Sequence, residues 1–262
     1  MPPAELERLL KPANKDELAN ILTYHVVAGD VKSSDLSDGQ MVETVQGEGG
    51  LNAANPEWLR RIAEIAKAHG ALLIVDDIQA GCGRAGGFFS FEGMGFTPDI
   101  VTMAKSLSGM GLPFALTLFR PELDQWSPGE HNGTFRGNNH AFVTATAALR
   151  HFWSGDDFQR DVARRGGLLE TRLDRIAAEH GFETRGRGMM RGVNTGSGEL
   201  ASAVTAACFD AGLIIETSGA HDEVIKVLAP LIIDDATLAT GLDILETKIR
   251  EAMAADYAVA AE

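Results

Sequence analysis

The sequence predicts an α/β protein in which helices cover a largely parallel sheet. Apolar residues recur at helical spacing from residue 56 to residue 69, and an apolar run without polar alternation follows directly at residues 71–75. Two more apolar runs, at residues 98–103 and 113–119, follow after short connections. Strands that are apolar on both faces are typical of parallel sheets with helices on either side. Alternation of helix and strand with short connections favours the same layered architecture.

The first forty residues predict helical segments, a short strand and a turn. Asn14 can cap a helix that carries Glu17 at its third position. Residues 24–27 are strand-like, and residues 33–39 have the composition of a turn before an apolar stretch that begins at Met41. No catalytic residue type stands out in this segment.

The next predicted element is a helix with clear N-terminal signals in the sequence. Asn55 is a favourable cap, Pro56 suits the first helical position, and Gly70 is expected to end the helix. Its apolar face consists of Leu59, Ile62 and Ile65.

A composition shift near residues 154–156 predicts a domain boundary, followed by a small α/β domain. We expect this domain to open with a long amphipathic helix that is interrupted at Gly166 and Gly167. The other elements expected there are strands at 213–215 and 224–228 and a helix over 235–257.

The composition excludes several classes of protein. A net charge of −14, with no Lys/Arg run longer than a pair, argues against nucleic-acid binding. The apolar runs have the length of single strands and not of membrane spans, and the first residues do not form a signal peptide. The two cysteines, Cys82 and Cys208, allow neither a disulfide framework nor a four-thiolate metal site. We therefore expect a metal-free, cytoplasmic protein; an acidic surface also fits a salt-loving source.

Three stretches carry residues that can do chemistry. Asp76 stands where a buried strand ends, at the sheet edge where ligands bind in open α/β sheets. Lys105 follows another strand directly, so partial burial there could lower its pKa and supply a nucleophilic amine. Residues 131–139 form a polar, glycine-rich loop in which Thr134 and backbone amides could hold a phosphate.

Each signal also has an ordinary structural interpretation. A strand-end Asp often caps the next turn, a single Lys is usually a solvated surface charge, and Thr134 could simply close a turn. Together, however, an acid, a lysine and a phosphate-type loop are what a pyridoxal-phosphate site requires. The lysine forms a Schiff base, the acid keeps the pyridine nitrogen protonated, and the loop holds the phosphate.

The order of these motifs resembles that of class III aminotransferases. The resemblance is carried by residues 43–50, then 76–79, then Lys105, then residues 133–135. Finer details, including Asp77 directly after Asp76 and the stretches 129–142 and 186–190, resemble the diaminobutyrate–2-oxoglutarate branch associated with ectoine synthesis. The likeness runs from about Val42 to the C-terminus.

This resemblance implies a role for each matching residue. Lys105 would hold the cofactor covalently and move the proton, Asp76 would pair with the pyridinium nitrogen, and Gln79 would approach the ring hydroxyl. Thr134 would reach the phosphate bound by a neighbouring subunit, which implies a homodimer with shared active sites.

Substrate binding is implied at two further positions. Lys226 stands where many relatives have an arginine that grips a carboxylate, although lysine cannot make the bidentate fork. Glu48 matches the glutamate that pairs with that arginine, so a Glu48–Lys226 pair is expected. The implied substrates are an amino acid such as 2,4-diaminobutyrate and 2-oxoglutarate, with another ω-amino acid as the alternative donor.

Residues 4–47 instead resemble part of a fasciclin domain, an adhesion module. We therefore expect a chimera with three parts: a fasciclin-like fragment (1–46), an incomplete type I pyridoxal-phosphate transferase large domain (47–154) and a small C-terminal α/β domain (155–262). Two alternative functions remain open. The chain could be an inactive truncated enzyme that binds cofactor weakly, or a fasciclin-type binding or adhesion protein.

Overall fold

The computed structural model describes residues 41–130, 132–133 and 136–260. The helix expected at Asn14, the strand expected at 24–27 and the fasciclin-like segment up to residue 40 lie outside this part of the chain. Thr134 lies outside it as well.

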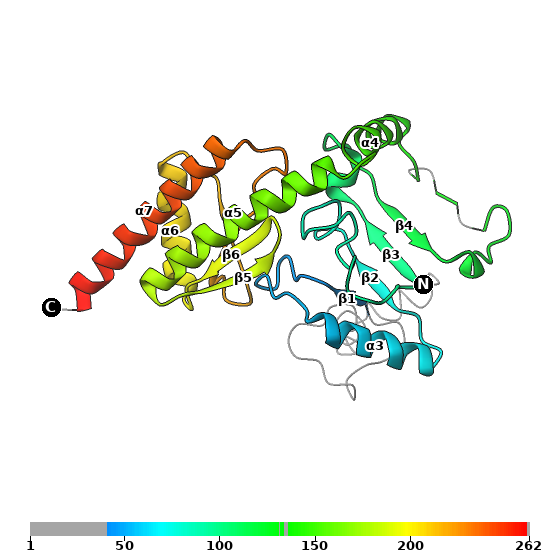
Figure 1. Ribbon diagram of the computed structural model, residues 1–262, viewed down its shortest axis with the longest axis horizontal. Coiled ribbons are helices and arrows are strands. Elements are labelled where there is room, and N and C mark those ends of the chain that lie inside the picture. Colours follow the sequence, from blue (N-terminus) through cyan, green and yellow to red (C-terminus); the bar gives the residue numbers. More distant parts are fainter. Residues whose placement is uncertain (1–40, 131, 134–135, 261–262) are drawn as a thin grey trace, which may run out of the picture.

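The first sheet has four strands in the order β1-β2-β3-β4 (Figure 1). Strands β1 (Met41–Glu43), β2 (Ile74–Asp76) and β3 (Ile100–Met103) run parallel. Strand β4 (Leu116–Phe119) pairs with β3 in the antiparallel direction, and its Leu116 and Leu118 are exposed. The parallel sheet predicted around residues 71–75 is confirmed, although β2 begins only at Ile74.

Helix α3 (Pro56–Ala68) covers this sheet, and its predicted start is confirmed. The Asn55 side chain accepts a hydrogen bond from the Glu57 N–H at 2.8 Å, and Pro56 occupies the first helical position. The helix ends at Ala68, two residues before Gly70. Its buried side chains pack against apolar residues of β1 and β2; the cluster contains Val42, Leu59, Ile62, Leu73, Val75 and Met94.

The first helical elements after β3 are two short 3₁₀ helices and one α-helix. The short 3₁₀ helices η3 (Lys105–Ser108) and η4 (Pro121–Leu123) flank β4, and α4 (Asn139–Phe152) comes after the described part of the glycine-rich loop. Asn138 caps α4 by accepting hydrogen bonds from the N–H groups of His140 and Ala141.

The second sheet is antiparallel, in the order β5-β6-β8-β7. Its strands are β5 (Glu183–Arg187), β6 (Met190–Asn194), β7 (Glu216–Ser218) and β8 (Val224–Val227). Helices α5 (Asp157–His180), α6 (Gly198–Asp210) and α7 (Asp235–Ala260) pack with these strands around one apolar cluster. The long C-terminal helix and the strand at 224–227 agree with the prediction.

Two expectations for this region are wrong. Helix α5 is not interrupted at Gly166 and Gly167 but runs continuously from Asp157 to His180. A side chain at position 166 would lie 3.3 Å from the Gly188 backbone, so glycine there lets the helix pack close to the β5–β6 turn. The apolar residues 213–215 are not a strand, because the paired residues are those of the next segment, β7.

Arg84 joins the first half of the chain to the second sheet. Its guanidinium donates hydrogen bonds to the carbonyls of Met189 at 3.2 Å and Ala229 at 2.6 Å. The Met189 N–H donates back to the Arg84 carbonyl at 2.9 Å. Helix α5 spans the distance between the two sheets (Figure 1).

The core around α5 gives a first testable prediction. Replacing the fully buried Leu169 by alanine should lower the free energy of unfolding by about 2–5 kcal/mol, since the cavity adds to the lost burial. The neighbouring Leu168 is 45% exposed and is the matched control; its alanine variant should lose less than about 1 kcal/mol. Urea unfolding followed by circular dichroism measures both. Equal losses would contradict this packing.

Candidate active site

The predicted site residues of the first sheet lie at one edge. Asp76 ends β2, and its register partner in the parallel neighbour β3 is Thr102, three residues before Lys105. Glu43 is the partner of Asp76 on the other side, in β1. Because parallel strands end at the same edge, an acid, a second acid and a lysine meet where ligands bind in open α/β sheets.

The two adjacent aspartates have different surroundings. Asp76 is half-buried, and its Oδ1 accepts a hydrogen bond from the Ile78 N–H at 2.9 Å. Asp77 is 1% exposed, and its Oδ2 accepts a hydrogen bond from the Ser90 N–H at 3.1 Å. Burial raises the pKa of Asp77 above its usual range. Asp77 therefore anchors the following loop, whereas the Asp76 carboxyl keeps surface that a ligand can contact.

Lys105 has a strained backbone at the start of η3. Its φ of +51° lies in the left-handed region, which is uncommon for a residue with a side chain and which recurs at functional sites. Its side chain is exposed, so the expectation of a partly buried amine is wrong for this structure. The reason is local: η3 turns Leu107 and Ser108 into the core and leaves Lys105 and Ser106 at the surface.

Glu48, Gln79 and Lys226 form a connected group, of which the sequence suggested the Glu48–Lys226 pair and not the contact with Gln79. Gln79 Nε2 donates to Glu48 Oε1 at 2.7 Å, and Lys226 Nζ donates to Glu48 Oε2 at 3.1 Å. Lys226 Nζ also lies 3.3 Å from the Gly47 carbonyl oxygen and 2.9 Å from Glu216 Oε1. The expected Glu48–Lys226 pair is therefore present, and Glu216 is a member that sequence reasoning missed.

The electrostatics connect this group with the edge of the first sheet. The hydrogen bond from Gln79 lowers the pKa of Glu48, and the charges of Lys226 and Lys105 lower it further. Burial raises the pKa of Glu43, and the negative charges of Asp76 and Glu48 raise it further. Carboxylates and lysines from both sheets thus act on one another at a single site.

The described residues that follow Thr134 in the sequence line a hollow of about 850 Å³. Its wall is formed by residues 113–115 at the approach to β4 and by residues 136–140 at the start of α4. Arg136, the first described residue after Thr134, contributes a positive charge to this wall.

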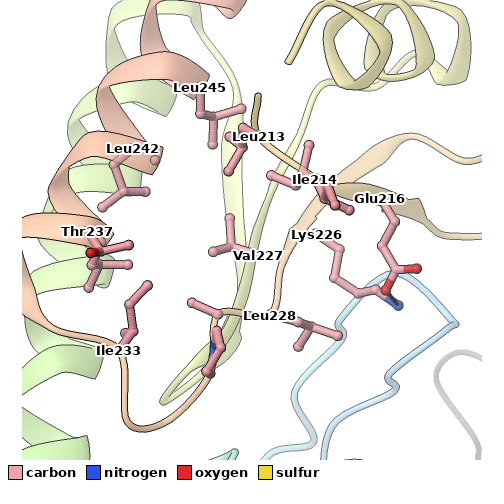
Figure 2. A pocket seen from close by; sticks show the side chains of 15 residues that line it. Leu213, Ile214, Glu216, Lys226, Val227, Leu228, Ile233, Thr237, Leu242 and Leu245 are labelled. Carbon is pink, nitrogen blue, oxygen red and sulfur yellow. Dashed lines mark ion pairs between the residues drawn. The ribbon is translucent and has the colours of Figure 1, made fainter. Parts of the chain in front are cut away.

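A second cavity, of about 380 Å³, lies between α7 and the β7–β8 pair. Its lining is mainly aliphatic, including Leu213, Val227, Ile233, Leu242 and Leu245, while Glu216 and Lys226 stand at one side of it (Figure 2). Within the described ranges, no group of three His, Cys, Asp or Glu side chains is arranged to hold a metal ion. The same ranges contain no helix long and apolar enough to cross a membrane.

Comparisons with known proteins identify the relatives of this chain. The family model "Aminotransferase class-III" matches residues 4–249. The diaminobutyrate–2-oxoglutarate transaminase of Halomonas elongata is 58% identical over 223 residues, which cover 83% of this chain and 53% of the relative. The enzyme of the same name from Vibrio cholerae is 56% identical, with 80% and 52% covered. The chain thus spans about half the length of the curated relatives it matches.

Solved structures agree with these relatives. The N-acetylornithine aminotransferase of Stenotrophomonas maltophilia has a TM-score of 0.72 and 33% identity, and the match covers 82% of this chain and 57% of that one. An aminotransferase of Bacillus anthracis has a TM-score of 0.75 and 25% identity, with 90% and 56% covered. The large-domain fold expected for a type I pyridoxal-phosphate enzyme is therefore confirmed.

The family match also bears on the N-terminal segment. It includes residues 4–47, the segment that resembles a fasciclin fragment, and the comparisons give that resemblance no support. The motifs at residues 43–50, 76–79 and Lys105 lie within the same match. The chain belongs to the class III aminotransferases, a family that depends on pyridoxal phosphate.

Proposed function

We propose that this chain supplies the catalytic lysine and the cofactor-facing acid of a pyridoxal-phosphate-dependent transaminase. The observation that carries the proposal is the meeting of Asp76, Lys105 and the Gln79–Glu48–Lys226 group at one sheet edge. The proposed reaction moves an amino group between 2,4-diaminobutyrate and 2-oxoglutarate, as the names of the curated relatives suggest. We place it in the cytoplasmic synthesis of ectoine.

The residues present fit this cofactor. Pyridoxal phosphate, when bound, supplies an electron sink that makes the α-proton of an amino acid acidic. Asp76 offers a carboxylate that is oriented by the Ile78 N–H, which suits a partner for a protonated ring nitrogen. Gln79 has an amide next to the same edge, which suits a contact with the ring hydroxyl.

Lys105 is the group that we propose to hold the cofactor and to move the proton. A lysine amine can form a covalent bond with a carbonyl and can then accept and return a proton at its Nζ. Lys105 follows the register partner of Asp76, Thr102, by three residues, so it lies at the same end of the sheet as Asp76. This position and the strained backbone of Lys105 favour the role.

We also propose that Thr134 contacts the cofactor phosphate of a neighbouring protomer, so that the active form is a homodimer. The hollow whose wall contains Arg136, the first described residue after Thr134, supports this proposal, because a guanidinium there can bind an anion.

A test of Lys105 uses its alanine variant. The purified wild-type protein should hold pyridoxal phosphate covalently, show the visible absorbance of bound cofactor, and keep the cofactor mass on the Lys105 peptide after borohydride reduction. Lys105→Ala should lose this covalent bond completely. Lys67→Ala, which removes an exposed lysine of α3, is the control and should behave as wild type. Covalent cofactor in Lys105→Ala, or in neither protein, would refute the assignment.

Lys226 is tested through 2-oxoglutarate. Lys226→Met keeps the volume of the side chain but removes its charge, so the affinity for 2-oxoglutarate should fall roughly tenfold to a hundredfold, the effect of losing one charge-assisted contact. Lys248→Met in α7, where the lysine pairs with Glu251 at the surface, is the matched control. Titration calorimetry of the cofactor-loaded protein measures the change. An unchanged affinity in Lys226→Met removes Lys226 from the substrate site.

A further inference from the structure

The ammonium of Lys226 is buried among three oxygen atoms. Its side chain is fully buried, and Nζ lies within 3.3 Å of Gly47 O, Glu48 Oε2 and Glu216 Oε1. Glu216 is placed there by the sheet, because it is the direct register partner of Lys226 in the antiparallel β7–β8 pair. Figure 2 shows the two side chains extending from neighbouring strands toward the same point.

This arrangement leaves Lys226 no spare hydrogen. A lysine ammonium has three N–H groups, and three oxygens already surround it. An anionic substrate group can therefore reach Nζ only when one carboxylate moves away. Both carboxylates are largely exposed, but Glu48 lies in the turn at residues 47–50, whereas Glu216 is held opposite Lys226 by the pairing of β7 with β8. Glu48 is therefore the carboxylate that can turn away, and Glu216 then remains beside Lys226.

The charges of the group do not cancel. Two carboxylates against one ammonium give Glu48, Glu216 and Lys226 a formal net charge of −1, whereas Glu48 and Lys226 alone would be neutral. The aliphatic cavity beside Lys226 is poor in polar groups, which strengthens the field of the three charges toward any group that comes close.

We propose that Glu216 sets the charge preference of the substrate side-chain site, favouring a side chain that ends in an ammonium over one that ends in a carboxylate. Glu216 acts through Lys226 and is a positioning residue: it keeps the lysine neutralised when Glu48 turns away. This inference rests on the proposed function, in which a diamino acid and a 2-oxo diacid share one site.

The test compares three variants of the cofactor-loaded protein. Glu216→Gln removes the charge and keeps the shape, Glu216→Asp keeps the charge, and Glu183→Gln removes an exposed carboxylate at the start of β5 as the matched control. Binding of glutarate, a diacid without an amino group, is measured by titration calorimetry. The KM values for 2,4-diaminobutyrate and 2-oxoglutarate are measured in parallel, and circular dichroism checks the fold.

Glu216→Gln should bind glutarate about twofold to fivefold more tightly and should raise the KM for the diamino acid by a similar factor, as expected for one partly exposed charge pair. Glu216→Asp should keep the wild-type ratio of the KM for 2,4-diaminobutyrate to the KM for 2-oxoglutarate. Glu183→Gln should not change this ratio either. If the wild-type protein uses both substrates and Glu216→Gln has the same ratio of the two KM values, the inference is overturned and the proposed function stands. A wild-type protein that binds neither substrate nor cofactor refutes the proposed function, and the inference falls with it.

Discussion

The hydrogen bonds of Arg84 are the constraint on which the rest of the site depends. Gln79 and Glu48 belong to the first half of the chain, whereas Lys226 and Glu216 belong to the second sheet. Arg84 fixes the two relative to each other by donating to Met189 and Ala229, while Met189 donates back to its carbonyl. Burial lowers the pKa of Arg84 to about 10, so the group stays charged at neutral pH and the bonds remain charge-assisted.

Two glycines make this close approach possible. Gly188 has a φ of +61°, and a side chain there would lie 2.8 Å from the Ala85 carbonyl carbon, which is closer than a Cβ atom can approach. A side chain at Gly47 would collide with the amide of Gln79, which could then no longer donate to Glu48. Glycine at these positions therefore allows the two halves to meet and the polar group between them to form.

The sequence predicted elements whose signals are local. Asn55 and Pro56 mark the start of α3 because a cap needs only neighbouring residues, and the 3.6-residue period identified α5 and α7 without tertiary information. The predicted interruption of α5 at Gly166 was wrong, because this glycine allows packing against Gly188, which is distant in sequence.

The site was predicted only in part, because some of its contacts depend on residues that are distant in sequence. Motif order brought Asp76, Gln79, Lys105, Glu48 and Lys226 together as candidates, and the contact between Glu48 and Lys226 followed from their positions. Glu216 was missed because its role depends on the register of β7 against β8. The strand was also predicted three residues too early, at the apolar residues 213–215 and not at β7. The exposure of Lys105 depends on how η3 turns after β3, which a strand pattern does not contain.

A lysine at position 226 fits this site better than an arginine would. A buried cation is costly unless each of its donors is paired, and the three donors of an ammonium match the three oxygens around Lys226 Nζ. A guanidinium has five donors in a rigid plane, so the same oxygens would leave some of them unsatisfied. Glu48 and Glu216 are both more than half exposed, so they neutralise the lysine without being removed from water themselves. Such a site distinguishes substrate groups by the sign of their charge and not by their planar shape, because an ammonium lacks the paired, coplanar donors of a guanidinium.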